Sequence, residues 1–123
     1  IDIMATSVDV AGAEYPRERN GEALTPLEGR SLVPAFANQP IDRDVLFWEH
    51  EGNRAVRVDD WKLVAKGPKG AWELYNLADD RTELHDLAAT HPEKVTELRA
   101  KWEAYAHRTG ALPWIWKPAY GEK

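Results

Sequence analysis

A short run of charged and polar residues, Glu49–Arg54, interrupts the stretch LFWEHEGNRAVRVDDWKLV. Within this run, His50, Asn53 and Arg54 place an imidazole, an amide and a guanidinium close together in the sequence. Such a set can hydrogen-bond the hydroxyl groups of a sugar or bind an anionic group. These three residues are therefore the candidate ligand-binding residues of the chain.

The same run also fits a hairpin turn in solvent. Gly52 allows the chain to turn sharply, and successive side chains of the flanking strands point to opposite faces of a sheet. In this alternative, Arg54 forms an ion pair with Glu49 or Glu51 and binds no ligand. Taken alone, the residues favour the solvated turn.

The other polar residues form no complete active site. The chain has no cysteine, and neither Ser7 nor Ser31 lies in a G-x-S-x-G motif. The four histidines form no zinc-binding motif. The acidic run between 79 and 86 lacks the spacing and the glycine of a calcium-binding EF-hand. It favours a loop whose carboxylates accept backbone hydrogen bonds. We therefore expect no catalytic residue and no metal ligand in this chain.

Length and composition fit one modest domain. The chain has 123 residues, of which 43% are hydrophobic and 30% are charged. Its formal net charge of -5 gives no support to a nucleic-acid partner. No apolar run is long enough to span a membrane. The first residue is Ile1 rather than Met, which leads us to expect a fragment or a processed form.

Four short apolar runs predict a small antiparallel sheet. Two turns are clear, Asp59-Asp60 and the GPKG sequence of 67–70. Short turns favour antiparallel pairing, because parallel strands need long crossover connections. The predicted strands are Val45–Glu49, Arg54–Val58, Trp61–Lys66 and Ala71–Asn76.

The sequence before the strands predicts one helix and a long connection. Residues Ile1–Ala13 have helical spacing of apolar residues, with Gly12 as a helix stop. The segment Tyr15–Gln39 contains three prolines and no dominant period, so we expect an extended loop that needs a partner surface. One helical turn is predicted from Ser31.

An amphipathic helix is predicted after the strands. Thr90 and Glu93 have the spacing of a capping box, and Gly110 ends the pattern. The apolar stripe that should pack on one face of the sheet consists of Val95, Leu98, Trp102 and Tyr105. These elements predict an α+β fold: a four-stranded antiparallel sheet with a C-terminal helix across it, preceded by a short helix and a long loop.

The order and spacing of several motifs resemble the C-terminal subdomain of the sulfatase family, the arylsulfatase-like enzymes. The carrying motifs are R-A-V-R from Arg54, D-W-K-L-V from Asp60, W-E-L-Y-N-L from Trp72, and H-P-E from His91. Upstream, IDIMATSVDVAGAEYP is similar to the family's D-I-x-P-T helix, and LEGRSLVPAF to its L-D/E-G-x-S-L-x-P stretch. The resemblance covers nearly the whole chain.

Some positions depart from the family's pattern. Met4-Ala5 stands where the family has a residue and then proline, Asp59 replaces a glycine, and Asn76 replaces a common aspartate. The family's formylglycine, made within a C/S-x-P-x-R motif, and its carboxylate-bound calcium belong to the N-terminal domain. This chain has no such motif. The resemblance therefore implies no cofactor in this chain, with calcium and formylglycine in the parent protein.

The resemblance implies two regions and a function. Residues 1–44 would be the end of the parent catalytic domain and a linker, and residues 45–123 the C-terminal subdomain. The parent would hydrolyse a sulfate ester of a small molecule or glycan, with this chain inactive alone. His50, Asn53 and Arg54 would then lie at the outer rim of its cleft. The sequence leaves the compartment open, and a periplasmic or secreted parent is the expectation.

A stand-alone, non-catalytic binding module is the alternative. Six tryptophans are many for this length, and the tail from Trp114 to Tyr120 has no regular period. Such a tail usually packs on another surface. Together with Ile1–Ala13, the tail predicts an apolar patch that the parent's N-terminal domain covers. The chain alone is then expected to self-associate or to be poorly soluble.

Overall fold

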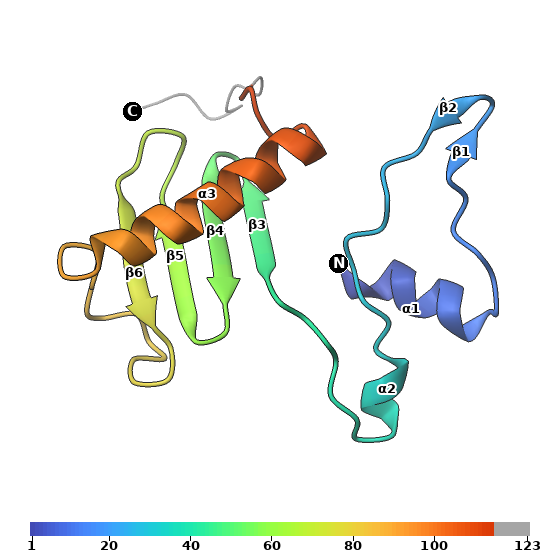
Figure 1. The fold of residues 1–123 in the computed structure, drawn as a ribbon, viewed down its shortest axis with the longest axis horizontal. Coiled ribbons are helices and arrows are strands. Elements are labelled where there is room, and N and C mark those ends of the chain that lie inside the picture. Colours follow the sequence, from blue (N-terminus) through green and yellow to red (C-terminus); the bar gives the residue numbers. More distant parts are fainter. Residues whose placement is uncertain (115–123) are drawn as a thin grey trace. The chain divides into compact units, whose positions relative to one another are not determined.

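The computed structural model describes residues 1–114 and divides the chain into two compact units, 1–43 and 44 onward. The predicted tail from Trp114 falls outside the described residues, except for Trp114 itself. The predicted α+β fold is confirmed, with a four-stranded antiparallel sheet and a long C-terminal helix in the second unit (Figure 1). No helix among residues 1–114 is long and apolar enough to cross a membrane.

The first unit has secondary structure but no core of its own. It contains α1 (Asp2–Val10), β1 (Glu18–Arg19), β2 (Glu22–Ala23) and α2 (Val33–Phe36). None of its residues is buried. The exposed fractions of Ile3 and Phe36 are 79% and 72%. Apolar residues at this exposure contribute little to folding, because they stay in water.

Polar contacts hold the first unit together instead. The Asp2 carboxylate accepts a hydrogen bond from the Arg30 backbone N–H at 2.9 Å and pairs with the Arg43 guanidinium at 2.5 Å. These two contacts lower the pKa of Asp2, the Arg43 hydrogen bond most. The Thr6 hydroxyl accepts from the Leu32 N–H at 3.0 Å. The contacts of Asp2 and Thr6 with Arg30 and Leu32 connect α1 to the loop before α2. The helix α2 is the helical turn predicted from Ser31.

One element of the first unit was not predicted from the sequence. Asn20 and Gly21 form the turn of a short hairpin between β1 and β2, both with positive φ. Asn-Gly is a strong signal for this type of two-residue turn. The predicted long loop therefore contains a short hairpin, which the sequence analysis missed because no apolar run flanks the turn.

The second unit is a meander with a helix across it. Its strands follow one another in space as they do in the chain, and each adjacent pair is antiparallel. The helix α3 (Pro92–Thr109) crosses one face of this sheet (Figure 1). The strands are β3 (Leu46–His50), β4 (Asn53–Val58), β5 (Trp61–Ala65) and β6 (Trp72–Asn76).

The core lies between the sheet and α3. Val56, Leu63 and Leu74 come from three adjacent strands and are fully buried beneath Leu98 and Trp102 of α3. Phe47 and Tyr105 stack at 4.3 Å between ring centroids and extend the contact toward the edge strand β3. The predicted stripe on α3 is therefore confirmed as the face that packs on the sheet.

The predicted capping box was wrong. The N-cap of α3 is His91, and no side chain caps the helix. The Thr90 hydroxyl donates to the Leu87 carbonyl at 3.0 Å, and the same carbonyl accepts the N–H of His91. Thr90 therefore closes the turn that precedes the helix, and its oxygen does not reach the helix N-terminus.

The acidic loop between β6 and α3 bonds to the backbone as predicted. One Asp80 oxygen accepts the N–H groups of Leu84 and His85, both at 2.8 Å. The Asp86 carboxylate accepts the N–H of Leu74 at 2.9 Å and so ties the loop to the edge of β6. The Asp86 carboxylate therefore takes the place of a strand partner at this edge.

Replacing Trp102 with alanine should remove the centre of the core. We expect Trp102→Ala to lower the free energy of unfolding by about 3–5 kcal/mol, since it truncates a buried aromatic side chain. The control is Glu97→Ala on the same helix, where an exposed pair with Lys94 at 2.7 Å is lost. That change should cost less than about 1 kcal/mol. Urea denaturation followed by circular dichroism measures both changes. Equal denaturation midpoints for Trp102→Ala and the unsubstituted chain would contradict the assignment of the core.

Candidate functional site

The three predicted site residues lie at one turn but not on one face. His50 and Asn53 are direct partners across the β3–β4 turn, and Glu49 is the partner of Arg54. Because side chains alternate along a strand, Arg54 points to the opposite face from His50 and Asn53. It faces α3, whereas His50 is exposed to solvent. The structure therefore brings His50 and Asn53 together and separates Arg54 from them.

Both polar groups of the Asn53 side chain form hydrogen bonds with the backbone of the protein. Its amide nitrogen donates to the His50 carbonyl at 2.9 Å, across its own turn. Its amide oxygen accepts the backbone N–H of Gly67 at 3.0 Å, in the turn between β5 and β6. Asn53 thus connects two turns that are separated in the sequence.

Arg54 makes the second connection between these turns. Its guanidinium donates to the carbonyls of Gly67 and Gly70, the latter at 3.1 Å, and more weakly to Gly52 at 3.4 Å. It lies 4.5 Å from the centroid of the Trp72 ring. Contacts of a guanidinium with an indole face are favourable, more so away from water.

The acidic residues near Arg54 in the sequence form no ion pair with it. Within residues 1–114, no ion pair joins Arg54 to Glu49 or Glu51. Glu49 instead accepts the backbone N–H of Gly52 at 3.0 Å. Burial lowers the pKa of the Arg54 guanidinium, and the positive charge of Arg99 lowers it further. The group remains cationic, because arginine is not deprotonated in proteins.

We call the set of contacts between the two turns the turn latch. It consists of the hydrogen bonds made by Asn53 and Arg54 to residues 67–70, and a close approach of Gly52 to Pro68. A Cβ on Gly52 would lie 2.6 Å from Cδ of Pro68, and φ of Gly52 is +84°. Only glycine meets both demands without a shift of the neighbouring turn.

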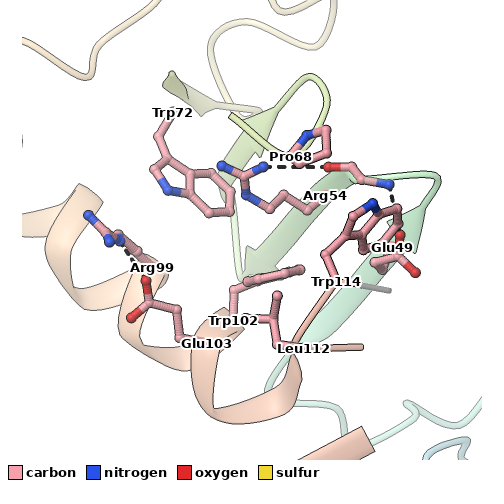
Figure 2. Close-up of a pocket in the computed structure, with 10 residues that line it drawn as sticks. Glu49, Arg54, Pro68, Trp72, Arg99, Trp102, Glu103, Leu112 and Trp114 are labelled. Carbon is pink, nitrogen blue, oxygen red and sulfur yellow. Dashed lines mark hydrogen bonds and ion pairs between the residues drawn. The ribbon is translucent and has the colours of Figure 1, made fainter. Parts of the chain in front are cut away.

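A pocket of about 230 Å³ opens beside the turn latch, which we call the indole pocket (Figure 2). The rings of Trp72 and Trp102 meet edge to face at 5.9 Å, and Trp114 stands across the pocket from Trp72. Arg99 and Glu103 of α3 form an ion pair at 2.7 Å. The lining residues are Glu49, Gly52, Arg54, Pro68, Trp72, Arg99, Trp102, Glu103, Leu112 and Trp114.

The sequence interpretation did not find this pocket. It placed Trp102 in the helix stripe that packs on the sheet, and it did not consider Arg99 with Glu103. The four-residue spacing of that pair on a predicted helix is a usable signal for an ion pair. The assembly of the pocket needs the sheet register, which places Arg54 and Trp72 on the same face across β5.

The pocket can bind and orient a ligand, but the part of the chain that the structure describes contains no group of side chains that could hold a metal ion. Among residues 1–114, no three His, Asp or Glu side chains lie close enough together to hold a metal ion. The residues present therefore do not fit the calcium site that the resemblance implies for the parent protein. The pocket offers aromatic surface, two guanidinium groups and two carboxylates, which suit non-covalent recognition of a ligand.

Relatives of the chain are sulfatases. No family model matches. An uncharacterised sulfatase of Schizosaccharomyces pombe is 32% identical over 119 residues, which cover 91% of this chain and 22% of the relative. Arylsulfatase K of Xenopus laevis is 28% identical over 110 residues, 82% of this chain and 20% of the relative. The solved structure of a 2-O GAG sulfatase has a TM-score of 0.63 at 26% identity, covering 89% of this chain and 24% of that one.

The chain belongs to the sulfatase family. It spans about a fifth of the length of these curated relatives. Bovine profilin-4 is also similar, at 30% identity over 97 residues, 73% of this chain and 71% of the relative. The sulfatase similarity extends over more of the chain and agrees with the solved structures, so it decides the family.

Substitution of Gly52 should show how tightly the two turns are packed. We expect Gly52→Ala to cost about 2–5 kcal/mol of unfolding free energy, since it combines left-handed strain with overpacking against Pro68. The matched control is Gly67→Ala, where φ is +68° but no atom lies within 4 Å of the new Cβ. It should lose only the strain, about 1–2 kcal/mol. Equal losses in chemical denaturation would show that Pro68 moves aside freely.

Proposed function

We propose that this sulfatase-family chain is the C-terminal part of a sulfate-ester hydrolase and serves in substrate binding rather than in the chemical step. The observation that carries the proposal is similarity to sulfatases over 91% of this chain but only 22% of the relative. The remaining length of such a relative is where the nucleophile and the metal ligands would lie. The chain itself has no cysteine, and Ser7 and Ser31 lack the C/S-x-P-x-R context.

The first unit supports a larger parent protein. Its residues are all at least partly exposed, and Ile3, Met4, Val10 and Phe36 expose more than half of their surface. A nine-residue helix such as α1 is marginal in water without packing. We infer that the catalytic domain of the parent covers this surface. A stand-alone binding module would leave it in water, which makes that alternative the weaker one.

The proposed substrate is a sulfated glycan. Two solved neighbours of the same fold were studied with saccharides, one with a k-i-k-neocarrahexaose and one with its substrate D-glucosamine-2-N,6-O-disulfate. Both are 23% identical to this chain, with TM-scores of 0.65. For this chain, the substrate therefore belongs to the proposal, together with calcium and formylglycine as cofactors of the parent.

The β3–β4 turn is the proposed contribution to the substrate cleft. His50 is exposed, and within the described residues its imidazole makes no hydrogen bond or ion pair, so the ring is accessible to a ligand. Asn53 and Arg54 give their polar groups to the turn latch and so fix the place of His50. In this proposal His50 contacts the substrate, and the other two line the rim and position the turn.

The chain alone should show no sulfatase activity. We expect no turnover of an aryl sulfate above the uncatalysed rate, with or without calcium, because the nucleophile is absent. Release of the phenol followed by absorbance measures this. Calcium-dependent turnover by the pure chain would contradict the proposal.

In the full-length parent, His50→Ala should weaken binding of the glycan. A lost hydrogen bond to a substrate group typically costs about 0.5–1.5 kcal/mol, so kcat/KM for the glycan should fall about two- to tenfold. A minimal aryl sulfate should react at an unchanged rate, since it does not reach the turn. His107→Ala, at an exposed position near the end of α3, is the control. Equal kcat/KM values of His50→Ala and the unsubstituted parent protein on the glycan would contradict a role of this turn in substrate binding.

A further inference from the structure

We propose that the indole pocket binds a single saccharide ring through its faces and hydroxyl groups, and not through a sulfate group. The choice of a saccharide rests on the proposed function, whereas the preference for the uncharged parts of the ring comes from the pocket itself. Four observations on the pocket support this: its size, its aromatic walls, its ion pair and its charge balance.

The size suits one ring. The pocket measures about 230 Å³, below the roughly 300–1,000 Å³ typical of sites for drug-sized ligands. A ligand larger than one ring would extend out of it. The two sheet turns in its walls are held together by the turn latch, and α3 is held on the sheet by the core residues Leu98 and Trp102, so the pocket exists before a ligand arrives.

The walls provide apolar surface with a fixed position. Trp72 and Trp114 are half-buried and line opposite sides, while Trp102 is 4% exposed and forms the base between them (Figure 2). The Trp102 indole N–H donates to the Trp48 carbonyl at 3.2 Å, which fixes the ring. The C–H groups on one face of a pyranose ring pack well on such aromatic surfaces, as large rigid side chains give contact area at little entropic cost.

The ion pair on α3 presents a donor and an acceptor side by side. Nε of Arg99 lies 2.7 Å from Oε1 of Glu103, and the two side chains are 57% and 44% exposed. The guanidinium has further N–H groups and the carboxylate has a second oxygen. Adjacent hydroxyl groups of a sugar can therefore accept from Arg99 and donate to Glu103 at the same time. Hydrogen bonds to charged groups are the stronger ones.

The charge balance argues against recognition of a sulfate group. Two cations, Arg54 and Arg99, stand with two carboxylates, Glu49 and Glu103, among the lining residues. The Arg54 guanidinium already donates to three backbone carbonyls. An anion in the pocket would be repelled by two carboxylates as well as attracted by two guanidinium groups, so its net electrostatic attraction would be small.

The test compares two rings by NMR titration of the 123-residue chain. N-acetylglucosamine is an uncharged ring, and D-glucosamine-2-N,6-O-disulfate has the same ring with an N-sulfate in place of the acetyl group and a sulfate on O6. Both should shift the indole N–H signals of the pocket tryptophans, with dissociation constants on the order of 1 mM for a ligand of this size. The two constants should agree within about threefold and change little with salt.

A matched pair of variants on one helix locates the binding. Glu103→Gln removes the carboxylate of the pocket and should weaken binding about tenfold. Glu97→Gln changes the same residue type in a similar ion pair with Lys94, away from the pocket lining, and should leave binding unchanged. Equal effects of the two variants would overturn the proposal.

The remaining outcomes are equally informative. Absence of shifts with both rings, or binding of only the disulfate with steep weakening by salt, would overturn the proposal. The first would show that the pocket binds no sugar, and the second would show general attraction of an anion. Ring binding by the chain without sulfate hydrolysis by the parent would leave this inference standing and remove the proposed function. Hydrolysis without ring binding would do the reverse.

Discussion

The second unit depends on the placement of one indole. Trp102 packs on the strand core from the centre of α3, donates its N–H to the backbone of Trp48 in the edge strand, and meets the ring of Trp72 in the opposite edge strand. A single side chain thereby joins the helix to both edges of the sheet. The cation of Arg54 lies near the same indole, at 5.8 Å from the ring centroid, so the core and the candidate site share a wall.

The position of Arg54 explains why a charged side chain is tolerated beside this core. A half-buried guanidinium would be costly without partners, because it leaves water. Three carbonyl groups and an aromatic face replace that water. A lysine could not make the same set of contacts, since its ammonium is a compact charge without a planar face or a forked arrangement of donors. An arginine is therefore needed at position 54 to hold the two turns and the Trp72 ring in place.

Much of the second unit could be predicted from the sequence because its signals are local. Alternation in Trp61–Lys66, the turn glycines of 67–70 and the stripe around Trp102 each report their own environment. The orientation of Arg54 needed only the same alternation, counted from the turn, but its partners did not follow from it. Glu49 and Glu51 are neighbours in sequence, whereas the actual partners, Gly67 and Gly70, are brought close by the register of β4 with β5. The capping box at Thr90 failed for another reason: the N-cap of α3 is His91, one residue later than the spacing implies, and Thr90 lies in the turn before it.

The two units differ in how they meet the cost of ordering the chain, and this difference bears on function. The second buries Val56, Leu63 and Leu74 under a long helix, which offsets that cost within its own residues. The first relies on contacts such as those of Asp2 and Thr6, which are partly exposed and individually weak. The second unit can therefore hold the β3–β4 turn in a fixed shape through its own contacts, whereas the first unit has no buried core that would do the same for its own loops.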